Sequence, residues 1–120
     1  MNVEKFLVKE GSKLDLKKHA TGFTGDYTDK KTAAIDLAKN IEKLRALQDI
    51  LYAQDSSSLL IIFQAMDAAG KDSAIEHVMS GVNPQGCKVV TFKTPSAEEL
   101  SHDFLWRVHQ KAPAKGLIGI

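Results

Sequence analysis

The stretch SLLIIFQAMDAAGKDSAI, residues 58–75, decides the fold. Its first eight residues form an apolar run with β-branched side chains, typical of a strand buried on both faces of a parallel sheet. Residues 73–82 then carry apolar side chains at helical spacing, and Gly81 with Asn83-Pro84 ends that helix. A strand, a tight loop and a helix in this order form the context in which phosphate-binding loops occur.

The remaining segments continue the alternation of helices and strands. Apolar residues at helical spacing predict an amphipathic helix over residues 32–54, and CKVVTF, residues 87–92, is typical of a second strand. A capping-box pattern at Ser96–Glu99 opens a helix to about Lys111, and GLIGI, residues 116–120, indicates a third strand. This order predicts an α/β fold: a three-layer sandwich of P-loop type with a parallel sheet.

The chain divides into three predicted parts. Residues 1–31 form a polar, extended arm with one short element, and residues 32–54 form the amphipathic helix. Residues 55–120 form the first part of an α/β core of P-loop type, with only its first strands. Because residues 116–120 resemble a buried strand with nothing after them to cover it, we expect the chain to be a fragment.

Composition excludes several classes of function. The net charge of +1 gives no basic field for nucleic acid or membrane binding, so any anion site must be local. The single cysteine, Cys87, excludes an intramolecular disulfide and a cysteine-rich zinc site. No apolar run approaches the roughly 20 residues of a membrane span, and no signal peptide is evident, so the expected location is the cytoplasm.

The loop after the first strand departs from the standard pattern G-x-x-x-x-G-K-[ST]. In that register Gly70 and Lys71 match, whereas Ala65 replaces the first glycine and Asp72 replaces the hydroxyl residue. Backbone N–H groups would still converge at a helix N-terminus, where the helix dipole favours anions, and Lys71 adds a point charge. The predicted phosphate-binding residues are Ala68, Ala69, Gly70, Lys71, Asp72 and Ser73.

The two acids of this loop, Asp67 and Asp72, need an explanation of their own. Phosphates would repel Asp67 unless a cation such as Mg²⁺ lies between them, and Mg²⁺ commonly joins carboxylates to phosphates. Alternatively, Asp67 orients or deprotonates an attacking oxygen. Asp72 is placed to cap the following helix. The competing interpretation is a tight turn with a solvated lysine and a capping aspartate.

Several motifs together resemble one known family. They are FQAMDAAGKDSAIEHVMSGVNPQGC at residues 63–87, FKTPSAEEL at 92–100, HDFLWR at 102–107, and the spacing of Pro113, Gly116 and Ile118. From about Leu14 to Ile120 the chain resembles the family-2 polyphosphate kinases, P-loop enzymes that move phosphate between inorganic polyphosphate and nucleotides. Ala65 before Met-Asp, with the Gly-Lys-Asp ending, is similar to the branch that phosphorylates AMP as well as ADP.

The resemblance implies roles for matched positions. Asp67 corresponds to the aspartate that the family uses with Mg²⁺ and in catalysis, and Lys71 belongs to the phosphate-cradling pair with Gly70. The implied partners are polyphosphate and AMP, ADP or ATP. A homo-oligomer is also expected. After the strand equivalent to residues 116–120, the family continues with an F-x-R-S-x-Y-E type segment, a second acidic metal site and a basic helical lid, which this sequence does not contain.

Three further residues are candidates for contact with substrate. Lys93 and Thr94 follow the second predicted strand at its carboxyl end, where open α/β sheets bind ligands. Arg107 offers a guanidinium suited to bidentate contact with oxyanions. The alternatives are a turn for Lys93 and Thr94 and a surface position for Arg107.

The function predicted from these observations is Mg²⁺-dependent phosphate transfer between polyphosphate and nucleoside mono- or diphosphates. Two alternatives stay open. One is a P-loop small-molecule kinase that uses ATP as the donor. The other is a truncated, non-catalytic module that binds phosphate or a partner subunit.

Overall fold

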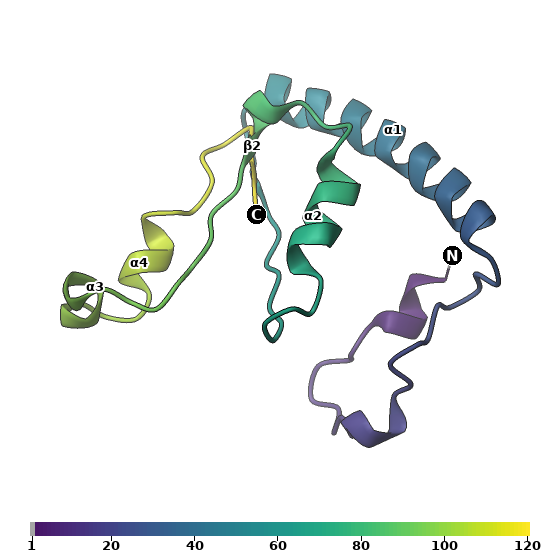
Figure 1. The fold of residues 1–120 in the computed structure, drawn as a ribbon. Coiled ribbons are helices and arrows are strands. Elements are labelled where there is room, and N and C mark those ends of the chain that lie inside the picture. The colour runs from purple at the N-terminus through teal and green to yellow at the C-terminus, as the bar shows by residue number, and fades with distance from the viewer. Residues whose placement is uncertain (1) are drawn as a thin grey trace. The chain divides into compact units, whose positions relative to one another are not determined.

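The structure is a computed structural model that describes residues 2–120 (Figure 1). The chain forms two compact units, one ending at Ala38 and the other running from Lys39 to Ile120. The boundary falls inside the long helix α1, Lys30–Gln54. Within the described residues, no helix is long and apolar enough to cross a membrane.

The first unit contains two short helices where the sequence predicted one element. These are the 3₁₀ turns η1, Val3–Phe6, and η2, Leu16–Lys18. Each begins at a side-chain cap, because Asn2 and Asp15 accept hydrogen bonds from backbone N–H groups two residues further on. Local capping by single Asn and Asp residues carries little periodicity, which is why the second turn was missed.

Helix α1 confirms the helix predicted over residues 32–54 and begins slightly earlier, at Lys30. Asp29 explains the starting point. Its carboxylate accepts hydrogen bonds from the N–H of Thr32 at 2.8 Å and from the Thr32 hydroxyl at 2.7 Å. A side chain that satisfies a free N–H of the first turn fixes where a helix begins.

The second unit holds a parallel sheet, as the sequence predicted. The strands are β1 (Leu59–Leu60), β2 (Cys87–Lys88) and β3 (Ile118–Gly119), in the order β1-β3-β2. Ile118 lies level with Leu59 on one side and Cys87 on the other. Between β1 and β2 the chain forms α2, Lys71–Met79, and the 3₁₀ turn η3, Pro84–Gly86.

All three strands are shorter than predicted. The central strand β3 pairs with its neighbours as far as the bonds from Ile61 N to Gly119 O and from Val90 N to Ile120 O, both 2.8 Å. Beyond these bonds the two outer segments have no strand between them among residues 2–120. Their side chains are correspondingly open, since Leu60 is 51% and Ile62 76% exposed, and the predicted two-sided burial of residues 58–65 is wrong here.

The single helix predicted from Ser96 to about Lys111 is two helices, α3 (Ala97–Ser101) and α4 (Trp106–His109). Asp103 causes the break. Its carboxylate accepts the N–H of Leu105 at 2.8 Å, and its carbonyl accepts the N–H of Trp106 at 2.9 Å. Such local bonds compete with a continuous helix. The predicted capping box at Ser96 and Glu99 is confirmed, with both reciprocal bonds present.

A buried glutamine joins α1 to the start of β2. The Gln48 side chain, 2% exposed, accepts the N–H of Asn83 at 2.9 Å and donates to the carbonyl of Asn83 at 2.8 Å. It also donates to the Cys87 sulfur at 3.2 Å. The Gln48 amide therefore pairs with both the N–H and the carbonyl of Asn83, as the backbone of a neighbouring strand would.

Replacing Gln48 with alanine is expected to destabilise the second unit by about 1–3 kcal/mol, because the polar groups of Asn83 lose their partners. Urea denaturation followed by circular dichroism measures the change. Gln54→Ala, at the exposed end of the same helix, is the matched control and should change stability little. Equal stability of the two variants would contradict the role given to Gln48.

The Cys87 thiol is expected to react slowly. Burial raises its pKa above the ordinary value, against a smaller opposite effect of the hydrogen bond from Gln48. A higher pKa means less thiolate at pH 8, and thiolate is the reactive form. Reaction with a disulfide reagent at pH 8 should therefore be slower in the folded chain than in denaturant. Equal rates would contradict the burial of this thiol.

Candidate functional site

The loop between β1 and α2 has the backbone of an anion-binding turn. Ala68 and Gly70 adopt positive φ angles of 57° and 87°, and the N–H of Ala69 bonds back to the carbonyl of Met66 at 3.3 Å. The first bond into α2 runs from Ala74 N to Gly70 O at 3.0 Å. The N–H groups from Gly70 to Ser73 therefore have no acceptor within the helix, and they can bind an anion at its N-terminus.

Lys71 crosses this loop. Its ammonium donates to the carbonyl of Ala65 at 3.2 Å and to that of Met66 at 3.1 Å. An ammonium group has three protons, so one donor is free for an anion. The loop's own backbone thus holds the ammonium through two of its three protons.

The two acids of the loop occupy different environments. Asp67 is exposed, and one of its carboxylate oxygens accepts the N–H of Ala68 at 3.0 Å. The predicted cap at Asp72 is wrong, because the N-cap position is Gly70 and no side chain caps α2. Asp72 is the second residue of the helix, since the helix begins at Lys71 and not at residue 73. There the helix dipole favours its negative charge without a capping bond.

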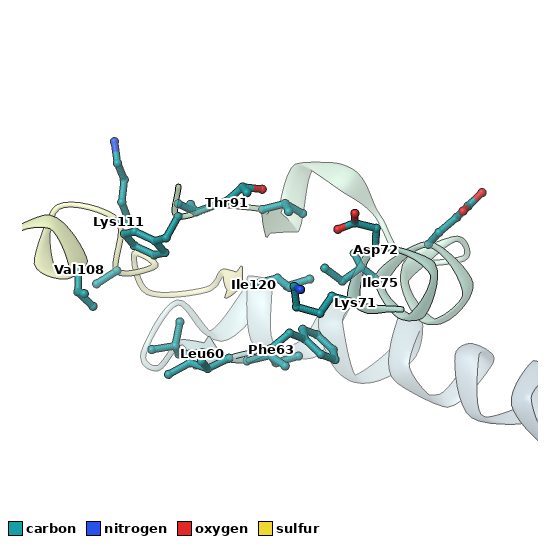
Figure 2. A pocket seen from close by; sticks show the side chains of 16 residues that line it. Leu60, Phe63, Lys71, Asp72, Ile75, Thr91, Val108, Lys111 and Ile120 are labelled. Carbon is teal, nitrogen blue, oxygen red and sulfur yellow. The ribbon is translucent and has the colours of Figure 1, made fainter. Parts of the chain in front are cut away.

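A cleft of about 550 Å³ adjoins the loop (Figure 2). Its walls come from the segments that continue β1 and β2, from the first turns of α2, and from the C-terminal side of α4. Most lining side chains are apolar, such as Leu60, Phe63, Ile75 and Ile120, with Lys71 and Asp72 among them. The loop and the cleft therefore meet at Lys71 and Asp72.

The residues present fit a magnesium ion whose other ligands come from substrate phosphates and water. Among residues 2–120, no group of three or more His, Cys, Asp or Glu side chains could hold a metal ion on its own. Asp67 keeps one carboxylate oxygen outside its bond to Ala68. Mg²⁺ is typically bound by one or two carboxylates together with substrate phosphates and water, so a single available carboxylate suits it.

The three remaining candidates, Lys93, Thr94 and Arg107, lie in different surroundings. Lys93 and Thr94 are exposed and follow the cleft-lining Phe92. The Arg107 side chain is 17% exposed and contacts protein groups: it donates to the carbonyl of Lys93 at 2.9 Å and lies 3.2 Å from Glu99. Sequence reasoning missed Phe92 and Lys111 of the cleft. The spacing of Val108 and Lys111, one helical turn apart, was the available signal.

Gly70→Ala is expected to weaken binding of pyrophosphate by about 5- to 30-fold. An L-residue held at positive φ costs about 1–2 kcal/mol, and 1.4 kcal/mol corresponds to a tenfold change. Isothermal titration calorimetry measures the affinity. Gly22→Ala is the control, because its added Cβ meets nothing within 4 Å and its φ is ordinary. Unchanged affinity in Gly70→Ala would show that this backbone does not hold the anion.

Comparison with known proteins gives consistent matches. The family model described as Polyphosphate kinase 2 matches residues 27–120. The chain is 49% identical over 120 residues to an ADP-polyphosphate phosphotransferase of Rhodopseudomonas palustris, covering 42% of that protein. It is 41% identical over 115 residues to an AMP/ADP-polyphosphate phosphotransferase of Meiothermus ruber, covering 43% of that protein and 95% of this chain.

A solved structure agrees with these matches. The crystal structure of Polyphosphate Kinase 2 from Arthrobacter aurescens is 38% identical, with a TM-score of 0.81. The similarity covers 93% of this chain and 41% of that one. The chain thus spans about two fifths of the length of the relatives it matches.

Proposed function

Because the chain belongs to the polyphosphate kinase 2 family, we propose that it carries the phosphate-binding part of an enzyme that transfers phosphate between inorganic polyphosphate and nucleotides. The observation that carries the proposal is the family match over residues 27–120, which includes the whole loop from Ala65 to Ser73. Since the chain spans about two fifths of its relatives, the activity, substrates and partners of the whole protein are part of the proposal.

In this proposal the polyphosphate chain binds at the N-terminus of α2. The backbone N–H groups from Gly70 to Ser73 point to a phosphate, and Lys71 donates its free proton to a phosphate oxygen. The small side chains of Ala68, Ala69 and Gly70 let the backbone approach closely. Most of the catalysis is positioning and stabilisation of charge, as in other phosphoryl transfers.

Asp67 is the proposed catalytic carboxylate of the loop and the proposed ligand for Mg²⁺. The ion, when bound, neutralises charge on the phosphates and so removes their repulsion from Asp67. The bond from Ala68 N fixes one carboxylate oxygen, and the other oxygen is the one proposed to bind the ion. Lys71 carries the second catalytic role, because its position over the loop places a fixed positive charge near the transferred group.

The proposed acceptors are AMP and ADP. Relatives that match over most of this chain are named as ADP- and AMP/ADP-polyphosphate phosphotransferases, and the Ala65 variant of the loop resembles the branch that uses AMP. Lys93 and Thr94, with Arg107 bonded to the Lys93 carbonyl behind them, form the proposed substrate side of the site. A homo-oligomer in the cytoplasm, where nucleotides are abundant, completes the proposal.

Asp67→Asn is expected to lower phosphate transfer by at least about 100-fold, because losing one fixed charge-stabilising group typically costs that much. Nucleotide chromatography measures ADP and ATP formed from AMP or ADP with polyphosphate and Mg²⁺. The folded fraction, by circular dichroism, should stay unchanged, since Asp67 is exposed. Asp49→Asn, an exposed acid on α1, is the control.

The identity of the phosphate donor distinguishes this proposal from an ATP-dependent small-molecule kinase. Product formed from ATP but not from polyphosphate would favour an ATP-dependent kinase. Transfer that is equally fast in wild type and Asp67→Asn would remove the role given to Asp67. Binding of polyphosphate without any transfer would favour a non-catalytic phosphate-binding module.

A further inference from the structure

Arg107 holds the segment that follows β2. Its guanidinium donates to the carbonyl of Lys93 at 2.9 Å, and its central carbon lies 4.9 Å from the centre of the Phe92 ring. Phe92 lines the cleft that also contains Lys71. One side chain from α4 thus contacts Phe92, on the wall of that cleft, and holds the backbone of Lys93, the next residue.

Glu99 in turn holds Arg107. One of its carboxylate oxygens lies 3.2 Å from the Arg107 Nε, and the other accepts the N–H of Ser96 at 2.7 Å. The side chains of Arg107 and Glu99 are 17% and 25% exposed, so water screens the pair only partly. The Nε atom is buried and close to the carboxylate, but its N–H is not aligned with it as a hydrogen bond. The contact is therefore mainly one of charge.

The positive charges of Arg107 and Lys93 therefore lie in different environments. The charge of Arg107 is neutralised by Glu99 and directed into the protein, whereas Lys93 is exposed, with its backbone carbonyl held in place. A lysine ammonium loses much conformational freedom when it binds a phosphate. Fixing the backbone that carries it lowers that loss.

We propose that Glu99 and Arg107 are positioning residues, which hold the backbone of Lys93, next to the cleft-lining Phe92, so that the Lys93 ammonium binds the phosphate chain of the substrate. The inference rests on the proposed function, since it takes the phosphate loop at Lys71 as the centre of the site. Neither Glu99 nor Arg107 touches the phosphate. Both act through the backbone at Lys93.

Glu99→Gln tests the charge and leaves the helix start intact, because glutamine also serves at this position of a capping box. We expect the variant to bind tripolyphosphate about fivefold more weakly than wild type by calorimetry, and Lys93→Ala to show a similar loss. Adding Glu99→Gln to Lys93→Ala should then cause no further loss, because Glu99 acts through Lys93. Arg107→Lys should also bind tripolyphosphate more weakly than wild type, since an ammonium lacks the planar fork of the guanidinium.

Glu98→Gln is the matched control, since Glu98 lies on the same helical turn and pairs with no cation among the described residues. If Glu99→Gln lowers tripolyphosphate affinity by the same factor in wild type and in Lys93→Ala, its effect is generally structural and the proposal is overturned. Unchanged affinity in Glu99→Gln would also overturn it.

Lys71→Met separates this proposal from the proposed function. If it leaves tripolyphosphate binding intact, or if wild type binds none, the phosphate loop itself fails and the positioning role falls with it. If Lys71→Met weakens binding while Glu99→Gln does not, only the positioning role is lost.

Discussion

The second unit depends on the pairing of one short strand with two others. Strand β3 bonds to β1 through Leu59 N and Ile61 N, and to β2 through the N–H of Ile120 and of Val90. Ile118, 1% exposed, lies at the centre of this pairing. Gly119 is required there, because a Cβ at this position would lie 2.9 Å from the ring of Pro113. The segment that leads to the loop before α2 and the segment that leads to Phe92 are held in one sheet through β3.

This pairing explains where the site lies. In a parallel sheet the carboxyl ends of all strands meet at one edge, so the loop after β1 and the segment after β2 leave the sheet on the same side. The cleft between them is lined from both segments and from α2 and α4 (Figure 2). Its wall near Lys71 is fixed by bonds within the loop itself. Its wall near Phe92 is fixed by a longer path, from Glu99 through Arg107, and so depends on contacts between elements.

The same distinction decides how much the sequence could predict. The helix over residues 32–54, the capping box at Ser96 and the strand–loop–helix around Gly70 depend on periodicity or on neighbours a few residues apart, and the structure confirms them. The break at Asp103 was missed because aspartate is tolerated in helices, and only its local bonds show that the helix stops. The bonds of Gln48 to Asn83 and of Arg107 to Lys93 join residues 35 and 14 positions apart, which no local pattern encodes. Of the candidate site, residue types and the loop were predictable, but the partners of Arg107 were not.

The electrostatics of the loop bear on which anion it would select. Two of the three Lys71 protons are engaged by the carbonyls of Ala65 and Met66, so the cation is fixed at little further entropic cost when an anion binds. Asp67 and Asp72 lie close by in sequence, and each repels a bare anion. A free phosphate therefore gains the N–H groups and one lysine proton but meets two carboxylates. A phosphate chain that carries Mg²⁺ would meet the same donors, and the metal would turn the repulsion of Asp67 into attraction. For the proposed substrate, Asp67 would therefore favour metal-bound polyphosphate over free phosphate.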